Sequence, residues 1–456
     1  MRVDAIVIGT GQGGVPLAAR LAESGWRVLV AERGHLGGTC VNTGCTPTKT
    51  LVASAQAAHD ARAAARLGVH AGDVTVDFAA VMRRVHDIVT QWRAGVAKRL
   101  EKQHERLTVL HGHARLVGPR RVEVNGETHE ADVFVLNVGG RPVIPPIPGL
   151  DAVPFLTSGT VLEVKELPRH LVVLGGGYIG CEMGQAFRRL GAEVTLIDGN
   201  PHLMSREDPE LSEALEGAFR DDGITLRLGS GVASVEAAEG GVRVRLKDGT
   251  MVDGSHLLVA TGRRPNTDEL GCEAGGIALD EKGFVTVDDG YRTSAEGVYA
   301  IGDCVPGPQF THESWDDGRI LFDVLTGARS GGRGGRLVPY TAFTDPQLAR
   351  VGLSEREAKE KGIAYEAASM PFGFIARAIE ADVTAGVAKV LIDPATERIL
   401  GAGIVGAQAG ELIHIFSTAM AAGAPARVLV DAQFVHPTFA EGVQSLVMRL
   451  DRYKLS

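Results

Sequence analysis

Two cysteines close together in the sequence carry the most informative chemistry in this chain. Cys40 and Cys45 stand five positions apart within the segment GGTCVNTGCTPTK, residues 37–49. An irregular turn or the first turn of a helix brings two such sulfurs within bonding range, but so small a loop gains little stability from a disulfide. A cysteine near a helix N-terminus is favoured as a thiolate, which suits thiol–disulfide exchange. The segment favours a redox pair, and two ordinary buried cysteines remain the alternative.

Composition narrows the classes of protein and partner. The chain has 456 residues with a net charge of −9, so we expect several domains and neither nucleic acid nor an anionic membrane as partner. No apolar run reaches the ~18 residues of a membrane span and no signal peptide precedes the first strand, which predicts a cytoplasmic protein. In that reducing compartment a Cys40–Cys45 disulfide would be catalytic. The other cysteines, Cys181, Cys272 and Cys304, are expected to be small buried side chains.

A nucleotide fingerprint follows the first predicted strand. Ala5–Ile8 is an apolar run typical of a strand buried on both faces. The glycines that follow it with G-x-G-x-x-G spacing are Gly9, Gly11 and Gly14. A helix over Val15–Ser24 and a strand over Val28–Ala31 come next, and Glu32 ends that strand, where a carboxylate accepts hydrogen bonds from a ribose. This order predicts a dinucleotide-binding βαβ unit.

The same pattern occurs a second time. The apolar run Leu171–Leu174 precedes GGGYIG, a predicted helix extends to Leu190, and the strand Val194–Ile197 ends in Asp198. In both units the acid lies 23 positions after the leading glycine, Gly9 in one and Gly175 in the other. This internal repeat predicts two separate dinucleotide sites, so that one bound cofactor can pass electrons to the other.

Further elements are expected between and after these units. A helix is predicted over residues 50–65, and a long amphipathic helix from Phe78 to about His104. The other predicted strands are 107–110, 121–124, 133–136 and 298–303, the last with a carboxylate at its end. The connecting segment 257–266 is similar to the stretch 137–142. From Val338 onward the composition indicates an α+β domain without a nucleotide fingerprint.

Taken together, these motifs resemble the flavin-dependent pyridine nucleotide–disulfide oxidoreductases, the family of lipoamide dehydrogenase, glutathione reductase and mercuric reductase. The resemblance covers the whole chain and implies an α/β fold with two Rossmann-like dinucleotide-binding domains and a C-terminal α+β dimerisation domain. It places an FAD-binding domain at 1–150 and 267–337, an NAD(P)-binding domain at 151–266, and the interface domain of a homodimer at 338–456. It further implies a relay from NADH or NADPH through FAD to a Cys40–Cys45 disulfide.

The resemblance also implies roles for individual residues. Tyr178 would cover the flavin until nicotinamide displaces it, Cys45 would contact the flavin, and Cys40 would be the thiol that meets substrate. Lys49 would pair with Glu182 beside the flavin and favour its reduction, with a surface ion pair of little weight as the alternative.

An acid–base pair is implied by the segment VHPTFAE near the end of the chain. His436 would be the acid–base group in the partner subunit's active site, and Glu441 would orient it.

Binding residues follow from the same motifs. For FAD they are Gly9, Gly11, Gly14, Glu32, Arg33, Gly38, Thr39, Lys49, Gly139 and Asp303. For NAD(P) they are Gly175, Gly177, Tyr178, Ile179, Asp198 and Gly262. Asp198 favours NADH because it would repel a 2′-phosphate, whereas Arg206 leaves NADPH open. Asn137-Val138 replaces the family's usual Ala-Thr, and we expect an altered loop near the cofactor without loss of binding.

The sequence says less about the electron acceptor than about the path of the electrons to the thiols. Residues 310–317 and 338–346 look most like the mercuric-reductase-like branch, but no cysteine follows Cys304, so the C-terminal cysteine pair of mercuric reductases proper is missing. We therefore expect a small disulfide, quinone or soft-metal acceptor. Dihydrolipoamide dehydrogenase is the alternative, and a non-catalytic redox sensor or an oxidase without a disulfide are alternatives of other classes. Glutathione reduction is disfavoured because paired arginines do not follow the second fingerprint. His312 and His414 lack partners at metal spacing, so no metal site is expected.

Overall fold

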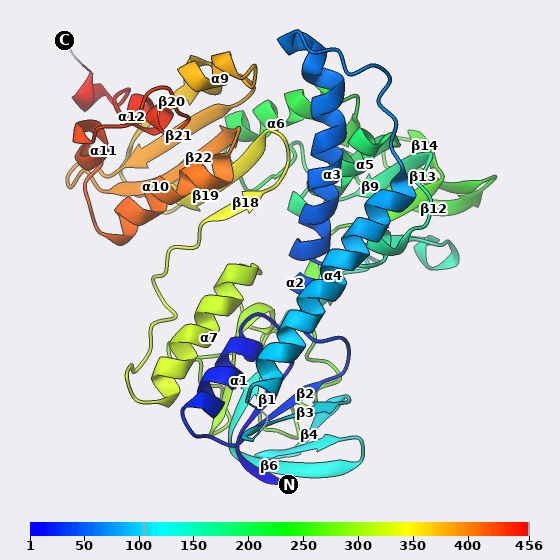
Figure 1. The fold of residues 1–456 in the computed structure, drawn as a ribbon, viewed down its shortest axis with the longest axis vertical. Coiled ribbons are helices and arrows are strands. Elements are labelled where there is room, and N and C mark those ends of the chain that lie inside the picture. The colour runs from blue at the N-terminus through cyan, green and yellow to red at the C-terminus, as the bar shows by residue number, and fades with distance from the viewer. Residues whose placement is uncertain (104, 455–456) are drawn as a thin grey trace. The chain divides into compact units, whose positions relative to one another are not determined.

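The computed structural model describes residues 1–103 and 105–454, which form two compact units (Figure 1). Unit 1 consists of Met1–Thr50, Met82–Val143 and Gly262–Arg336, and unit 2 of Leu51–Val81, Ile144–Thr261 and Leu337–Ser456. The finer three-domain boundaries expected from the sequence stay a prediction.

A seven-stranded sheet forms the centre of unit 1. Its strand order is β3-β2-β1-β6-β5-β4, with β17 also pairing with β6. The strands are β1 (Arg2–Ile8), β2 (Val28–Glu32), β3 (Leu107–His111), β4 (Ala114–Gly118), β5 (Arg121–Val124), β6 (Glu127–Leu136) and β17 (Val298–Ala300). The pairs of β1 with β2 and β6, β2 with β3, and β17 with β6 are parallel, so their carboxyl ends meet at one edge. The apolar run of β1 is buried on both faces, as predicted for a central parallel strand.

Helices cover this sheet. Helix α1 (Gly14–Glu23) packs beside α7 (Thr311–Leu325), and its buried Leu17 and Leu21 join the strand side chains in one core. Helix α2 (Gly38–Asn42) lies in unit 1. Helix α3 (Cys45–Ala63) begins in unit 1 and continues in unit 2, whereas α4 (Phe78–Glu101) begins in unit 2 and continues in unit 1. Short elements of unit 1 are β7 (Gly140–Pro142), β16 (Arg263–Pro265) and the 3-10 turn η4 (Gly302–Cys304). The antiparallel pair β7–β16 joins the two connecting segments that the sequence marks as similar.

Unit 2 contains a second parallel sheet with the order β11-β10-β9-β15-β8. Its strands are β8 (Leu156–Thr157), β9 (His170–Leu174), β10 (Glu193–Asp198), β11 (Thr225–Leu228) and β15 (His256–Val259). Also present are the antiparallel strands β12 (Val232–Ala238), β13 (Gly241–Leu246) and β14 (Met251–Gly254), the helices α5 (Tyr178–Leu190) and α6 (Pro209–Asp221), and the 3-10 turns η1 (Ala64–Leu67), η2 (Leu150–Ala152) and η3 (Thr160–Glu163).

The C-terminal part of unit 2 is built on an antiparallel sheet of order β18-β19-β22-β21-β20. Phe372 and Phe416 are fully buried in its core. The strands are β18 (Tyr340–Ala342), β19 (Gln347–Gly352), β20 (Glu366–Pro371), β21 (Val387–Ile392) and β22 (Ile399–Gly406). The helical segments are α8 (Glu355–Glu360), η5 (Phe372–Phe374), α9 (Ala376–Glu380), α10 (Ala409–Ala421), α11 (Arg427–Asp431), α12 (Glu441–Val447) and η6 (Asp451–Tyr453).

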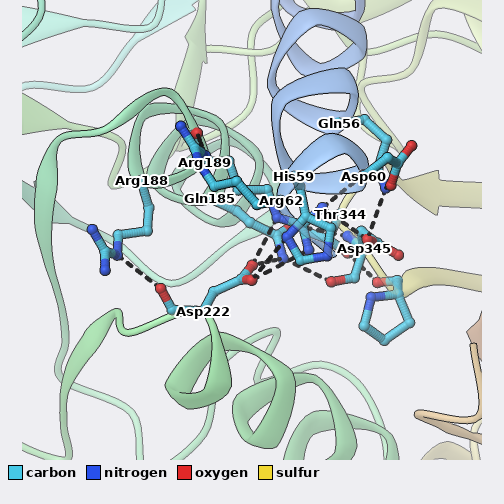
Figure 2. A network of polar contacts seen from close by, with 11 residues as sticks. Gln56, His59, Asp60, Arg62, Gln185, Arg188, Arg189, Asp222, Thr344 and Asp345 are labelled. Atoms are coloured by element: carbon cyan, nitrogen blue, oxygen red, sulfur yellow. Dashed lines mark hydrogen bonds and ion pairs between the residues drawn. The ribbon is translucent and has the colours of Figure 1, made fainter. Parts of the chain in front are cut away.

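A buried ionic network ties three segments of unit 2 together (Figure 2). Arg189 on α5 pairs with Asp222 at 2.8 Å and with Asp345 at 2.7 Å, and its side chain is only 7% exposed. Gln56 on α3 bonds to both Arg189 and Asp345, at 2.6 and 3.1 Å. Because a buried guanidinium requires compensating negative charge, Asp222 fixes how α5 meets the end of α6, and Asp345 fixes how α5 meets the segment before β19.

The fold tests several of the expectations drawn from the sequence. The α/β class is confirmed, as is the burial of Cys181, Cys272 and Cys304. The long helix ends at Glu101, before its expected end at residue 104, and that residue and 455–456 lie outside the described residues. Within the described residues, no helix is long and apolar enough to cross a membrane.

Candidate active site

The carboxyl ends of four parallel strands surround a cavity in unit 1. Gly9 follows β1, Glu32 ends β2, Gly112 follows β3 and Asn137 follows β6, and all four line a cavity of about 270 Å³. Parallel α/β sheets bind ligands at this edge, because the turns between strands and helices open there. The volume is close to the lower end of the range for small-molecule pockets.

Backbone geometry explains why glycines occupy the fingerprint turn. Gly9 has φ +99°, and a Cβ there would lie 2.3 Å from the carbonyl oxygen of Asn137. A Cβ on Gly38 would lie 2.8 Å from the Cα of Gly11, so the segment before Cys40 touches the fingerprint turn directly. Only glycine permits such close approach, and a phosphate-bearing ligand can therefore lie against bare backbone.

Glu32 holds the same turn through its carboxylate. Oε2 accepts hydrogen bonds from the backbone N–H of Thr10 at 2.9 Å and from its hydroxyl at 2.6 Å, while Oε1 accepts from the N–H of Gly34 at 2.8 Å. The acid thus lies in the cavity wall with its position fixed. A carboxylate has more acceptor sites than these three bonds use, which leaves capacity for a ribose hydroxyl.

Most of the FAD-binding residues expected from the sequence line this cavity. Those in the lining are Gly9, Gly11, Glu32, Arg33, Gly38, Thr39 and Gly139, whereas Gly14, Lys49 and Asp303 are not among them. Asp303 lies in η4 after β17, where burial raises the pKa of its carboxyl and the nearby Arg263 guanidinium opposes that rise. The lining also includes residues that the sequence analysis missed: His35, Asn42, Thr43, Gly112, His113 and Asn266. One sequence feature could have identified Gly112 and His113 as cavity residues, because both directly follow a parallel strand.

The thiol pair lies next to this turn. Cys40 lies in the short helix α2, and Cys45 is the first residue of the 19-residue helix α3. The Cys40 side chain is partly buried and that of Cys45 is exposed. A hydrogen bond with Cys45, followed by burial, raises the pKa of the Cys40 thiol. The Cys45 sulfur lies 3.1 Å from the hydroxyl oxygen of Thr311, the first residue of α7.

The second fingerprint has the same local construction in unit 2. The Gly176 N–H donates to Oδ2 of Asp198 at 2.6 Å, matching the bond from Thr10 to Glu32. A Cβ on Gly180 would lie 1.9 Å from the carbonyl oxygen of Gly175, so α5 packs tightly on β9. The expected Asp198 is therefore a turn-holding acid at the end of β10, while the Arg206 side chain is exposed.

The remaining expected residues are divided between the two units. Tyr178 and Ile179 begin α5 directly after Gly177, and the Tyr178 ring is half-buried. Glu182 is buried on the same helix, and its Oε1 accepts a hydrogen bond from the backbone N–H of Phe343 at 2.8 Å. In unit 1, Lys49 lies in the second turn of α3, and Gly262 precedes β16.

The structure brings His436 and Glu441 together. Nδ1 of His436 lies 2.9 Å from Oε2 of Glu441, the first residue of α12. The imidazole is 70% exposed while the glutamate side chain is 18% exposed, so one ring edge is held and the other is open to a ligand. A carboxylate on Nδ1 fixes the tautomer that leaves Nε2 for proton transfer.

The donor set of unit 1 fits FAD. A glycine turn, a helix N-terminus and an acid at the end of the second strand suit the pyrophosphate and ribose of a dinucleotide. Among the described residues, no cluster of His, Cys, Asp and Glu has the geometry of a metal site.

Comparisons with known proteins extend this description to the whole chain. Residues 3–318 match the pyridine nucleotide-disulphide oxidoreductase family, and residues 338–447 match its dimerisation domain. The mercuric reductase of Lysinibacillus sphaericus is 35% identical over 99% of this chain and 84% of its own length. The dihydrolipoyl dehydrogenase of Thermus scotoductus is 36% identical, covering 98% of this chain and 97% of its own.

A solved structure agrees with these sequence relationships. The Cu(II) complex of the HOCl-induced flavoprotein disulfide reductase RclA from Escherichia coli has a TM-score of 0.88 and 34% identity, covering 98% of this chain and 99% of that chain. The two family domains, the relatives that align over most of their length, and the geometry of the thiols and of the nucleotide turns all indicate the same family. The chain belongs to the pyridine nucleotide–disulfide oxidoreductases, a family of FAD- and NAD(P)H-dependent flavoprotein enzymes.

Proposed function

We propose that this protein passes an electron pair from a nicotinamide through FAD to the Cys40/Cys45 pair and on to a disulfide or soft-metal acceptor. The observation that carries the proposal is the contact between the two thiols, with Cys45 at the N-terminus of a long helix. That position favours a thiolate, because the helix dipole and the N–H groups of the first turn stabilise negative charge. Two thiols in contact need little movement to form a disulfide.

Bound FAD supplies hydride acceptance from the nicotinamide and delivery of an electron pair to sulfur. The chain holds each participant in place. The turn over Gly9 and Gly11 with Glu32 would hold FAD, and the turn over Gly175 and Gly177 with Asp198 would hold the nicotinamide nucleotide, while α2 and α3 carry the thiols.

The acceptor step balances for a disulfide substrate. The Cys40 thiolate attacks one sulfur of the acceptor, the acceptor's S–S bond breaks, and the leaving thiolate takes a proton. The Cys45 thiolate then attacks Cys40, releasing the second half of the acceptor as a thiolate that is protonated in turn. The protein dithiol is oxidised by two electrons, and the acceptor is reduced by the same two.

A base is needed because the Cys40 thiol holds its proton. The hydrogen bond to Cys45 and burial raise the pKa of Cys40, so few molecules carry a Cys40 thiolate at neutral pH. We infer that the protein is a homodimer through residues 338–447 and that His436 of the partner subunit takes up and returns this proton. Lys49, Glu182 and Tyr178 are proposed in the flavin-side roles that the family resemblance implies.

The acceptor class rests on chemistry and on relatives. Two adjacent thiolates are soft ligands for mercuric or cupric ion. One relative is named mercuric reductase, and one matching solved structure is a Cu(II) complex. Dihydrolipoamide is the second candidate, favoured by the 36% identical dihydrolipoyl dehydrogenase.

An acceptor panel tests the proposal. The purified protein with bound FAD is assayed with NADH and NADPH against small disulfides, quinones, mercuric and cupric ions, and in reverse with dihydrolipoamide and NAD. Cys40→Ser and Cys45→Ser should abolish turnover of the favoured acceptor. Rapid flavin reduction by the nicotinamide without turnover of any acceptor would instead support a redox sensor, and turnover that survives both serine variants would support an oxidase.

A further inference from the structure

We propose that Asn137 is a positioning residue for FAD, holding the glycine turn, the segment before Asp303 and the first turn of α7 in one arrangement. Asn137 directly follows β6, and its side chain is 5% exposed. The sequence marks the position as unusual, because the family resemblance leads one to expect alanine there. The proposal rests on the family's FAD dependence and not on the identity of the acceptor.

The side-chain amide bonds to three segments at once. Oδ1 accepts from the N–H of Gly14 at 2.9 Å, and Nδ2 donates to the carbonyl oxygen of Ile301 at 3.2 Å and to the Ser314 hydroxyl at 3.4 Å. The Asn137 backbone N–H also donates to the carbonyl oxygen of Ile8 at 2.9 Å. One residue therefore ties together the ends of β1, β6 and β17 and the starts of α1 and α7.

The bond to Gly14 caps α1 from a distant strand. Gly14 is the first residue of α1, and the N-cap residue Gly13 has no side chain that could supply a cap. The first N–H groups of a helix need partners from outside the helix. Asn137 supplies one with a neutral oxygen, which leaves the positive end of the helix dipole available to a phosphate.

Three glycines make room for this amide. A Cβ on Gly11 would lie 2.8 Å from Oδ1, one on Gly14 would lie 2.9 Å from it, and one on Gly302 would lie 2.9 Å from Nδ2. The amide thus fills the space that glycines on two separate segments leave open. An alanine at position 137 would leave that space unfilled and leave the Gly14 N–H without its partner.

The contacts of Asn137 extend to both sides of the proposed site. Asn137 lines the cavity together with Gly11, and Gly302 immediately precedes Asp303. Ser314 lies one turn along α7 from Thr311, whose hydroxyl touches Cys45. Loss of the amide should therefore loosen the turn that approaches the pyrophosphate, and FAD should bind less tightly.

The test compares FAD affinity with stability in Asn137→Ala and Asn137→Asp. Apoprotein is prepared by removing FAD, and rebinding is followed by quenching of flavin fluorescence. Asn137→Ala should raise the Kd for FAD about tenfold, since it removes hydrogen bonds that fix the binding turn. Asn137→Asp keeps the shape but replaces the donor and adds negative charge beside the phosphate site, so it should raise the Kd about 100-fold.

The control is Val122→Ala, which removes methyl groups from a fully buried side chain on β5 that does not line the cavity. It should lower the Tm of the apoprotein and holoprotein alike and leave the Kd for FAD within about twofold, as expected when folding alone is perturbed. In the Asn137 variants the Tm gain on adding FAD should shrink.

Wild-type affinity for FAD in Asn137→Ala, with Tm values that fall equally with and without FAD, would overturn the proposal in favour of a purely structural role. If the alanine variant does not fold, Asn137→Ser serves in its place, and an unchanged Kd for FAD there would overturn the proposal as well. Acceptor turnover plays no part in this measurement, so a failure of the proposed electron relay would leave its outcome unaffected.

Discussion

Glu441 holds His436 through a 2.9 Å contact between Oε2 and Nδ1, and both residues lie in the short segment 436–441 that ends at the first residue of α12. The glutamate is largely buried and the imidazole is exposed, so the carboxylate fixes a ring that can still reach a ligand. This arrangement suits a proton carrier better than a structural histidine, which would be enclosed.

Substituting Glu441 should therefore act through His436. We expect His436→Ala to lower kcat with a disulfide acceptor by about 10²- to 10⁴-fold, the usual worth of general acid–base catalysis. Glu441→Gln should lower it by about 10- to 100-fold, because the ring loses its fixed tautomer. Steady-state rates of the single and double variants measure this, with the exposed Glu411→Gln as control. Additive losses in the double variant would show that the two residues act independently.

The Thr311 hydroxyl should set the reactivity of the thiols. It contacts Cys45 at 3.1 Å, and its hydrogen bonding lowers the pKa of Cys40, against the larger raising effects of Cys45 and burial. Thr311→Val should therefore raise the pKa of Cys40 further and slow its alkylation by iodoacetamide several-fold at neutral pH. Thr326→Val, at the other end of α7, is the matched control and should leave the rate unchanged. Equal alkylation rates in both variants would remove Thr311 from the thiol site.

Asp198 should determine the choice of nicotinamide nucleotide. Its carboxylate bonds to the N–H groups of Gly176 and Asn200 at 2.6 and 2.7 Å, which leaves a fixed negative charge at the end of β10. NADH should be preferred, and Asp198→Asn should cut the ratio of kcat/KM for NADH over NADPH about tenfold or more. Asp248→Asn, an exposed acid of the same unit, should not change the ratio. A strong preference of the unaltered protein for NADPH would refute this role.

The stability of unit 2 should depend on Glu355 in acid. Hydrogen bonds from Lys359, Lys389 and Tyr365 lower the pKa of Glu355 from 4.5 to about 2. Because the folded state binds the proton less tightly than the unfolded chain, this stabilisation is fully present above pH 4.5 and is lost as the pH falls towards 2. Glu355→Gln should lower Tm by a few degrees at pH 7 and by much less near pH 3. Glu360→Gln on the same helix, 67% exposed, should change little at either pH; a pH-independent loss in Glu355→Gln would contradict the assignment.

Local sequence signals predicted much of the fold. The uninterrupted apolar run before Gly9, and its repeat before Gly175, specify strands buried on both faces, and both occur in parallel sheets. The terminal acids Glu32 and Asp198 could also be predicted, because each lies at a fixed offset from its leading glycine. The pair His436 and Glu441 was implied by the family resemblance, and the structure brings the two residues together.

Contacts between distant segments could not be predicted from local sequence patterns. The sequence marks Asn137 as unusual, but its partners Gly14, Ile301 and Ser314 are brought together only by the sheet order. Likewise, His113 reaches the cavity because β3 pairs with β2. Such pairings depend on tertiary packing, which periodicity in one segment does not encode.

The central claim is that Cys40 and Cys45 store the electron pair, and counting thiols tests it most directly. The protein with bound FAD is treated with iodoacetamide as purified and again after anaerobic reduction by one equivalent of NADH, and labelled cysteines are identified by mass spectrometry. We predict two additional labelled thiols on reduction, at Cys40 and Cys45, with the buried Cys181, Cys272 and Cys304 unlabelled in both samples. Identical labelling before and after reduction would contradict the account.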